Sequence, residues 1–194
     1  MTSEQNKKKK KASERESFGT KIGMSLNGVI SYSSYYKTKP QYKYLNSFIS
    51  IPELGETKLF TGTKWQCVEY ARRYLLLTLG VTFSSIPMAW NIFTDLNAFE
   101  NIEDKSPKKI RKHLDGSNIP PRIHSLLIWS KACRRTGHVA VITNITESFV
   151  EICEQNWDHK EWINPNFSRR LQFIKDGGSY FIKESNILGW INIE

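Results

Sequence analysis

A cysteine, a histidine and a glutamate hold positions from which they could act as a nucleophile, a base and an orienting group. Cys67 falls in the first turn of a helix predicted for residues 66–79. Unpaired backbone N–H groups and the partial positive charge at a helix N-terminus favour thiolate over thiol. Most free cysteines, however, are small buried hydrophobic residues. The position of Cys67 alone therefore leaves a reactive and a structural role open.

His138 begins one predicted strand and Glu154 ends the next. A turn centred on Thr146 would pair these two positions directly, on one face, with their Cβ atoms about 5 Å apart. The carboxylate could then accept the imidazole Nδ1–H and leave Nε2 toward a thiolate. Taken singly, His138 is more often a structural residue, and an unpaired buried carboxylate is costly. Together with Cys67, the pair indicates the nucleophile, base and orienting group of a cysteine hydrolase.

The spacing of apolar residues predicts which elements position these three residues, and this spacing changes from helical to β-strand type along the chain. Helical spacing predicts a helix at residues 66–79, ended by Gly80, and a weaker one at 89–99. Residues 106–122 contain three prolines and a glycine, which predict a loop. Short β-rich runs follow at residues 126–129, 139–142, 149–152, 171–174 and 180–182. Helices early and strands late predict the α+β class, with helices packed on an antiparallel β-sheet.

Length and composition indicate one domain behind a short tail. The chain has 194 residues, of which 39% are hydrophobic and 12% aromatic, and this excludes uniform disorder. Residues 1–17 are polar and lack periodicity, so we expect a disordered basic tail and a domain at 18–194. The formal net charge of +9 and the run of five lysines could attract nucleic acid or act as a nuclear import signal. We favour a solvated tail, since the lysines have no interleaved aromatic residues.

Targeting signals are weak. No apolar run is long enough for a transmembrane helix, and no apolar stretch follows the basic N-terminus. Three cysteines cannot all pair with one another, so reduced thiols are expected. We therefore expect a cytoplasmic protein without membrane contact, and a monomer.

Three motifs carry a resemblance to a known family. They are Lys64-Trp-Gln-Cys-Val-Glu-Tyr-Ala-Arg-Arg73, Thr136-Gly-His-Val-Ala-Val-Ile142 and Ile152-Cys-Glu-Gln-Asn156. Their types and spacing resemble the CHAP family of cysteine amidohydrolases and peptidases. Weaker similarity covers nearly everything after the tail. The resemblance implies a papain-like fold for this domain.

The resemblance also implies roles for individual residues. It makes Cys67 the nucleophile, His138 the general base and acid, and Glu154 the group that orients the histidine. By similarity Gln66 holds the oxyanion-hole position, although backbone N–H groups at the helix start could serve equally. Asn156 is implied to lie at the site. Arg72 is matched to an arginine near the glutathione part of a substrate, with an ordinary surface charge as the alternative.

Other candidates compete poorly for these roles. His124 precedes an apolar strand and has no acidic partner in view. Cys133 is expected to be exposed and incidental, and Cys153 to face away from Glu154.

Within the family, the sequence is most similar to amidases of glutathione–polyamine conjugates. This implies hydrolysis of glutathionylspermidine to glutathione and spermidine through a thioester, with no cofactor and no metal. The small-molecule conjugate would be the partner. Two alternatives stay open: a peptidoglycan endopeptidase with the same three residues, and a catalytically retired CHAP module that binds an anionic partner.

Overall fold

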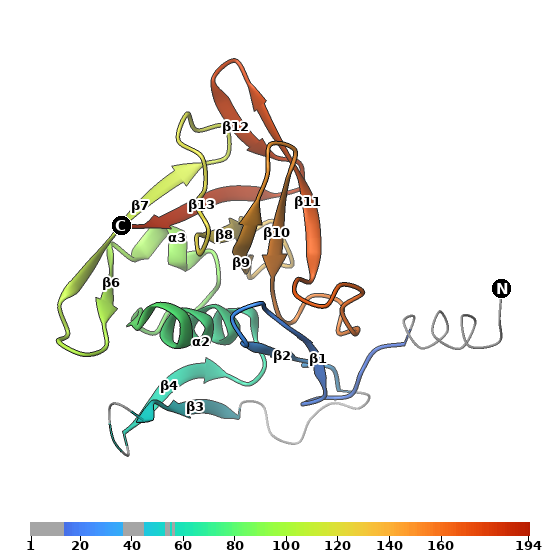
Figure 1. The fold of residues 1–194 in the computed structure, drawn as a ribbon. Coiled ribbons are helices and arrows are strands. Elements are labelled where there is room, and N and C mark those ends of the chain that lie inside the picture. Colours follow the sequence, from blue (N-terminus) through green and yellow to red (C-terminus); the bar gives the residue numbers. More distant parts are fainter. Residues whose placement is uncertain (1–13, 37–44, 53–54, 56) are drawn as a thin grey trace.

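The computed structural model describes residues 14–36, 45–52, 55 and 57–194. Its largest element is a nine-stranded antiparallel sheet (Figure 1). From one edge to the other, the strands are β12 (Ser179–Ile182), β11 (Arg169–Asp176), β10 (Phe149–Cys153), β9 (His138–Ile145), β8 (Leu126–Trp129), β13 (Ile187–Ile193), β7 (Pro107–Leu114), β6 (Ala98–Asn101) and β5 (Val81–Thr82). Two hairpins stand apart from this sheet: β1 (Lys21–Met24) with β2 (Ile30–Tyr32), and β3 (Asn46–Ser50) with β4 (Lys58–Thr63).

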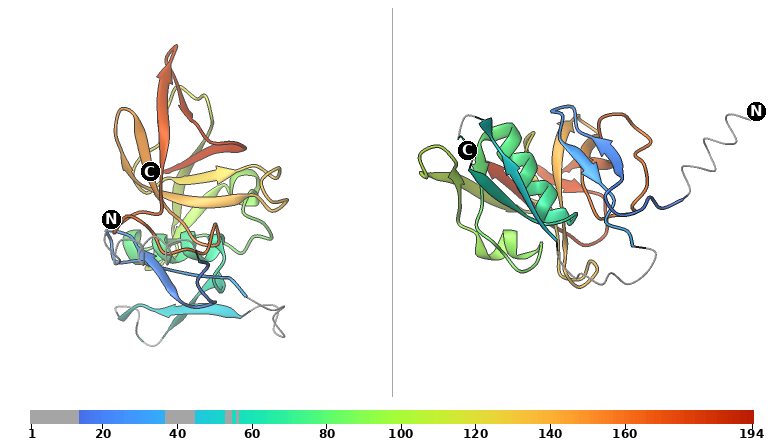
Figure 2. Two further views of the ribbon diagram at one scale, coloured as in Figure 1. Left: turned by 90° about the vertical axis from the view of Figure 1, so that its right-hand side faces the viewer. Right: turned by 90° about the horizontal axis from the view of Figure 1, so that it is seen from below.

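The long helix α2 (Cys67–Leu79) lies between the large sheet and the β3–β4 hairpin (Figures 1 and 2). Its fully buried face includes Tyr70, Ala71, Tyr74 and Leu75, at the spacing expected for one side of a helix. The helix ends at Gly80, whose φ of 63° is left-handed and whose N–H caps the last turn. The prediction of a helix at 66–79 is confirmed to within one residue.

Each face of the large sheet covers its own hydrophobic cluster. Val139 and Val141 of β9 point into the cluster that α2 closes, whereas Ala140 and Ile142 point into the other. The second cluster contains the fully buried Trp190. The alternation along β9 therefore assigns Val139 and Val141 to the face that α2 covers.

The predicted fold class is wrong. About 40% of the described residues lie in strands and 11% in helices, and the described part contains only two helices, so helices do not form a layer on the sheet. The predicted helix at 89–99 shrinks to α3 (Asn91–Asp95), because residues 98–100 pair with β7 instead. The predicted loop at 106–122 begins with β7, which pairs with β13 and β6. The five predicted β-rich runs are all strands.

The end of the predicted tail packs on the folded body. The backbone N–H of Glu16 donates to the carbonyl of His159 (2.8 Å), and Ser33 Oγ donates to the Glu16 carbonyl (2.6 Å). The Arg15 guanidinium lies 5.2 Å from the ring of Tyr35. Packing therefore begins before residue 18, while residues 1–13 of the predicted tail lie outside the described residues.

A buried polar network holds the first turns of α2. Glu69 is fully buried and accepts hydrogen bonds from Arg73 Nε (2.7 Å), Thr61 Oγ1 (3.0 Å) and Gln155 Nε2 (2.9 Å). Arg73 Nη1 also donates to the carbonyl of Ile30 (2.7 Å). The network joins α2 to β2, β4 and the segment after β10, which are the elements around Cys67.

No helix in the described ranges has the length and apolar composition needed to cross a membrane.

The Glu69→Gln variant should lose about 3 kcal/mol of unfolding free energy, because it leaves the buried Arg73 charge without its counter-charge. Chemical denaturation at neutral pH measures this loss. The control is Glu100→Gln, which removes one partner of an exposed pair with Lys105 (3.5 Å) and should change stability by less than about 1 kcal/mol. Equal small losses in both variants would contradict the importance of the network.

Candidate active site

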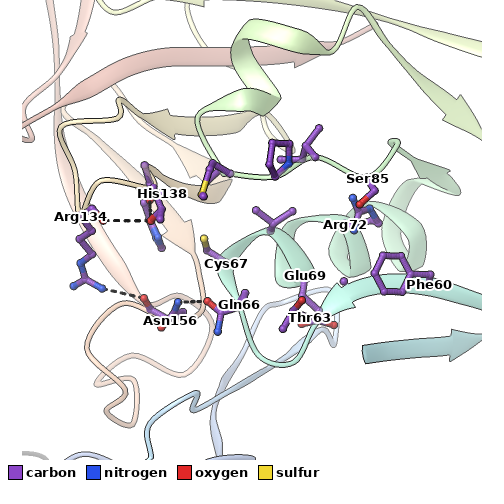
Figure 3. Close-up of a pocket in the computed structure, with 18 residues that line it drawn as sticks. Phe60, Thr63, Gln66, Cys67, Glu69, Arg72, Ser85, Arg134, His138 and Asn156 are labelled. Carbon is purple, nitrogen blue, oxygen red and sulfur yellow. Dashed lines mark hydrogen bonds between the residues drawn. The ribbon is translucent and has the colours of Figure 1, made fainter. Parts of the chain in front are cut away.

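Cys67 opens into a cleft of about 370 Å³ at the start of α2 (Figure 3). The walls come from β4, the first turns of α2, the segment before α3, and the residues around the start of β9 and the end of β10. They are formed by Phe60, Gly62, Thr63, Gln66, Cys67, Val68, Glu69, Arg72, Ser85, Ile86, Pro87, Met88, Ala89, Arg134, Thr136, Gly137, His138 and Asn156. The cleft therefore brings residues of all three resemblance motifs to one place.

The surroundings of Cys67 favour its thiolate. The residue is only 9% exposed, and burial acts to raise its pKa. The charge of His138, a hydrogen bond with that side chain, and backbone N–H groups of Val139 and Val68 outweigh the burial. The pKa of Cys67 consequently lies below its ordinary value.

His138 is the first residue of β9 and is 2% exposed. Burial acts to lower its pKa, but the charge and hydrogen bond of Cys67 and the contact with Glu154 raise the pKa to about 9. The Trp129 and Trp157 rings pack on the imidazole, with centroids at 5.1 and 4.8 Å. The imidazolium form therefore persists at neutral pH in a largely apolar enclosure.

Gly137 lets the chain approach closely at this point. Its φ is 66°, and a Cβ atom there would lie 2.7 Å from the Trp129 carbonyl oxygen and 2.9 Å from Trp90 Cβ. The segment that leads into α3 can thus pack directly beside His138.

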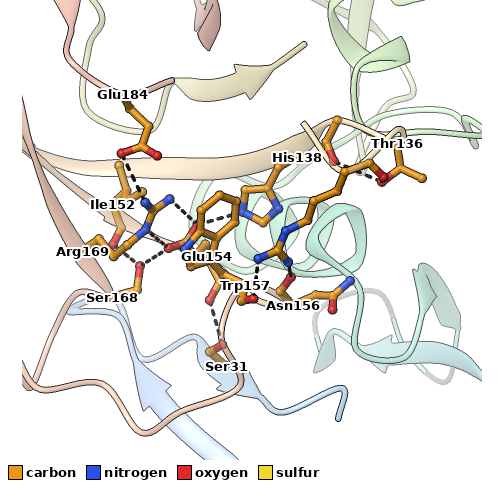
Figure 4. Close-up of polar contacts among 12 residues, drawn as sticks. Ser31, Thr136, His138, Ile152, Glu154, Asn156, Trp157, Ser168, Arg169 and Glu184 are labelled. Carbon is orange, nitrogen blue, oxygen red and sulfur yellow. Dashed lines mark hydrogen bonds and ion pairs between the residues drawn. The ribbon is translucent and has the colours of Figure 1, made fainter. Parts of the chain in front are cut away.

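Glu154 lies one residue beyond β10 and is 2% exposed. His138 Nε2 donates to Glu154 Oε2 (2.8 Å), and Arg169 Nε donates to Oε1 (2.6 Å), as Figure 4 shows. Ser168 Oγ also donates to Oε1 (3.2 Å). Burial acts to raise the pKa of Glu154, but His138 and Arg169 together lower it to about 2. The carboxylate is therefore ionised over the whole physiological range.

Two details of the predicted geometry are wrong, although the predicted contact is present. The β9–β10 ladder pairs Cys153 with Val141 and Ile152 with Ile142. The register shifts between Ile152 and the preceding residue, Glu151. In this register Glu154 reaches His138 diagonally, not from directly opposite. The carboxylate contacts Nε2, which leaves Nδ1 for Cys67, the reverse of the predicted assignment.

Gln66 and Asn156 contact each other beside Cys67. Asn156 Nδ2 donates to Gln66 Oε1 (2.6 Å), and Ser34 Oγ donates to Asn156 Oδ1 (2.7 Å). Gln66 is the N-cap residue of α2 but makes no side-chain cap bond. The contact with Asn156 therefore orients the Gln66 side-chain amide, including its Nε2 group. Both residues line the cleft.

Arg72 lines the cleft but is mainly held by the protein. The residue is 3% exposed, so it is not a surface charge. Its guanidinium donates to the carbonyls of Phe83 (3.1 Å), Thr61 (2.7 Å) and Ser84 (3.0 Å). Burial lowers its pKa to about 10.

Three residues at the site were missed by the sequence analysis: Arg169, Trp157 and Arg134. Arg169 pairs with Ile152 across β10 and β11, so a strand register for this second hairpin would have placed it near Glu154. Trp157 and Arg134 lie in irregular segments, where no period signals their position. Arg134 donates to the carbonyls of Asn156 (3.1 Å) and Trp157 (2.8 Å) and packs on the Trp157 ring at 4.3 Å.

The competing residues lie outside this cluster. His124 Nδ1 contacts the Tyr74 hydroxyl (2.9 Å). Cys133 is 7% exposed, so the prediction that it is exposed is wrong, and burial raises its pKa. Cys153 is buried too, and its thiol donates to the carbonyl of Asn166 (3.3 Å); burial raises its pKa to about 12. Of the three thiols, only Cys67 has a lowered pKa.

An arrangement of this kind can perform nucleophilic acyl transfer. A thiol with a lowered pKa lies beside an imidazole with a raised pKa, and a carboxylate accepts a hydrogen bond from the imidazole Nε2. Within the described residues, no group of three His, Cys, Asp or Glu side chains could hold a metal ion.

Comparison with known proteins agrees with this chemistry. A family model described as the CHAP domain matches residues 58–156. The bifunctional glutathionylspermidine synthetase/amidase of Escherichia coli (strain K12) is 34% identical over 181 residues, which are 90% of this chain and 29% of that protein. The glutathionylspermidine synthase of Crithidia fasciculata is 30% identical over 138 residues, 69% of this chain and 19% of that enzyme. Trypanothione synthetase from the same organism is 27% identical over 168 residues, 84% and 24% of the two chains.

The chain spans less than a third of the length of these relatives. The matches confirm the prediction that the chain is an enzyme of the cysteine amidase or hydrolase class. It belongs to the CHAP family.

The Glu154 carboxylate should make the stability of the protein depend on pH. Its folded pKa of about 2 lies below the ordinary 4.5, so its contribution is present above about pH 4.5 and is lost as pH falls through the folded pKa. The difference in unfolding free energy between wild type and Glu154→Gln should be about 3 kcal/mol at pH 7. Urea titrations should show it shrinking toward zero near pH 2.

The matched control is Glu151→Gln, because Glu151 is paired with Arg170 on the outer side of the same hairpin (2.6 Å). Its difference from wild type should stay small at every pH. A Glu154→Gln difference that does not change with pH would contradict the ionised pair.

Proposed function

We propose that the chain hydrolyses a glutathione–polyamine amide, releasing glutathione and the amine, with Cys67, His138 and Glu154 as its catalytic residues. The observation that carries this proposal is the meeting of Cys67 and His138 in one cleft, with Glu154 hydrogen-bonded to His138 and a lowered pKa at Cys67. The substrate class comes from the names of the relatives, which include glutathionylspermidine synthetase/amidase. The proposal takes glutathionylspermidine as the conjugate.

In the proposed mechanism the Cys67 sulfur attacks the amide carbonyl carbon and forms a tetrahedral intermediate. The protonated His138 gives its Nδ1 proton to the departing nitrogen as the C–N bond breaks, which leaves a thioester on Cys67 and a neutral imidazole. The imidazole then takes a proton from water, whose oxygen attacks the thioester. Departure of the acid restores the thiolate and imidazolium. Glu154 stays ionised and holds the imidazole throughout.

The oxyanion of the intermediate would form beside the start of α2. Backbone N–H groups are directed there because the first turn of a helix has no intrahelical acceptors for them. The Gln66 side-chain amide has its oxygen occupied by Asn156, so its Nε2 can donate. Gln66 is therefore proposed as an oxyanion donor, and Asn156 as the residue that orients it.

Arg72 is proposed to act on the acyl part of the substrate. Its guanidinium is fixed by three carbonyls and packs on the ring of Phe60 at 5.7 Å. Because it lies in the cleft wall, its positive charge attracts the carboxylate of a glutathionyl group.

A second candidate function is cleavage of a wall peptide, the peptidoglycan endopeptidase alternative. Arg134 lines the cleft together with His138, and the leaving amine must depart beside His138 because that residue protonates it. A fixed guanidinium there opposes a cationic polyamine and favours an amine that carries a carboxylate. Such an amine is what a peptide releases.

Cytoplasmic location, a monomeric state and the absence of a cofactor remain predictions.

The two candidates predict different products. Purified protein incubated with glutathionylspermidine should release glutathione and spermidine in equal amounts. Chromatography of the free amine measures this release. Purified peptidoglycan peptides should yield no new amino groups. Cys67→Ala should abolish turnover and keep the fold, since a methyl group fills nearly the same space. Cleavage of wall peptides without cleavage of the conjugate would overturn the proposal in favour of the alternative.

The rate should depend on pH as a broad bell. Below the lowered pKa of Cys67 the thiolate is lost, and above the His138 pKa of about 9 the imidazolium is lost. The alkaline limb of kcat/KM should therefore lie near pH 9, not near the ordinary histidine value of 6.5. Glu154→Gln should move this limb to lower pH and reduce kcat by about 10²–10⁴-fold.

His124→Gln serves as the control for the pH profile, because His124 lies outside the cluster. Its profile should match that of the wild type. An alkaline limb near pH 6.5 in the wild type would contradict the ion pair between Cys67 and His138.

A further inference from the structure

Arg169 contacts both oxygens of the Glu154 carboxylate. Its Nε donates to Oε1 (2.6 Å) and its Nη2 donates to Oε2 (3.2 Å) (Figure 4). Oε2 is the oxygen that also accepts from His138. A two-point contact of this kind fixes the orientation of the carboxylate plane as well as its charge.

The Arg169 guanidinium is itself held firmly. It packs on the ring of Trp157 at 4.1 Å and lies 5.6 Å from the ring of Trp129. Both rings also pack on His138. On its outer side, Arg169 Nη1 lies 3.6 Å from Glu184 Oε2, and the Glu184 side chain is 27% exposed. Arg169 therefore bridges the buried cluster and the surface.

The charges of the cluster cancel only when Arg169 is counted. A Cys67 thiolate, a His138 imidazolium and an ionised Glu154 leave one uncompensated negative charge, and the last two side chains are each 2% exposed. Placing an unpaired charge in such an environment is costly, so the cluster would take up a proton. The Arg169 guanidinium supplies the missing positive charge.

We propose that Arg169 is a positioning residue that fixes the Glu154 carboxylate and completes the charge balance under which Cys67 and His138 hold opposite charges. The proposal rests on the proposed function for its catalytic meaning. The electrostatic part of the proposal concerns the ionisation of the Cys67 thiol, which can be measured without a substrate.

Other charged groups face the cluster from each element around it. Glu184 opposes Arg169 from the segment after β12, but its exposure to water weakens its effect. Arg134 reaches the cleft from the loop before β9 and is fixed on carbonyls. Cys133, in the same loop, is buried and has a raised pKa. Glu69 of α2 is paired with Arg73. Among these, Arg169 alone contacts the carboxylate that holds His138.

The proposal fixes the sign of each change. Removing a positive charge makes protons bind more tightly to every neighbouring group. Loss of Arg169 should therefore shift both the formation of the Cys67 thiolate and the deprotonation of His138 to higher pH. Removing the Glu184 carboxylate should shift both to lower pH, and by less, since that group is partly exposed.

The experiment measures the rate of Cys67 alkylation by iodoacetamide as a function of pH, with the modified residue identified by peptide mass spectrometry and Cys67→Ala as the background. For Arg169→Met we expect the first midpoint of the alkylation profile to rise by about one pH unit. Arg169→Lys keeps the charge and loses the two-point contact, so its midpoint should stay near that of the wild type. With a cleaved substrate, it should lower kcat by about 10-fold with little change in KM.

The matched control is Arg170→Met, on the same strand, where Arg170 pairs with the outward Glu151 (2.6 Å). It should leave the profile unchanged. If Arg169→Met does not fold, Glu184→Gln tests the same balance, and its midpoint should fall.

Unchanged midpoints in both folded Arg169→Met and Glu184→Gln would overturn the proposal and leave Arg169 as a structural residue. Absence of glutathionylspermidine cleavage with shifted midpoints would overturn the proposed substrate, and would leave the role of Arg169 intact.

Discussion

Burial of charge is the constraint on which this site depends. His138 and Glu154 are each 2% exposed, and both are most stable in their ionised forms only because each faces a partner of opposite charge. The cleft can therefore hold a thiolate only if the whole cluster is nearly neutral. This requirement explains why an arginine from β11, remote from all three family motifs, reaches into the site. It also explains the two tryptophans, which exclude water that would otherwise weaken these interactions.

A second buried network gives Cys67, the proposed nucleophile, its position. Glu69 and Arg73 are one helical turn apart, and their pairing with Gln155 links α2 to the residue that follows Glu154. The same short segment after β10 thus supplies the carboxylate that contacts His138, the anchor of the helix and, through Asn156, a contact to Gln66. Three consecutive residues with three separate partners make this segment the point where helix and sheet are joined.

Local sequence signals predicted what depends on local structure. The helix could be predicted because its apolar period and Gly80 lie within the segment itself. Five of the six strands after residue 125, all but β13, could be predicted because their apolar runs are short and bounded by turns. By contrast, β7 has one buried side chain, Ile110, and owes its conformation to pairing with β13, about 80 residues away in the sequence. The site shows the same division. Cys67, His138 and Glu154 could be found from residue type and spacing. The register of β9 and β10 could not, because it shifts between Glu151 and Ile152, which no local pattern shows.

The proposed base begins strand β9 and its carboxylate directly follows the neighbouring strand β10, while the proposed nucleophile lies on a helix packed against that sheet. The hydrogen bond between His138 and Glu154 is stiffened by the β9–β10 ladder. The spacing between Cys67 and His138 is set instead by side-chain packing between α2 and β9, which is softer than a ladder of backbone hydrogen bonds. Low concentrations of denaturant, or hydrostatic pressure, that loosen helix-to-sheet packing would therefore disable the thiolate while the secondary structure still appears native. The protein should therefore lose activity before it unfolds, because the two sides of the cleft belong to elements that are held together by side-chain packing.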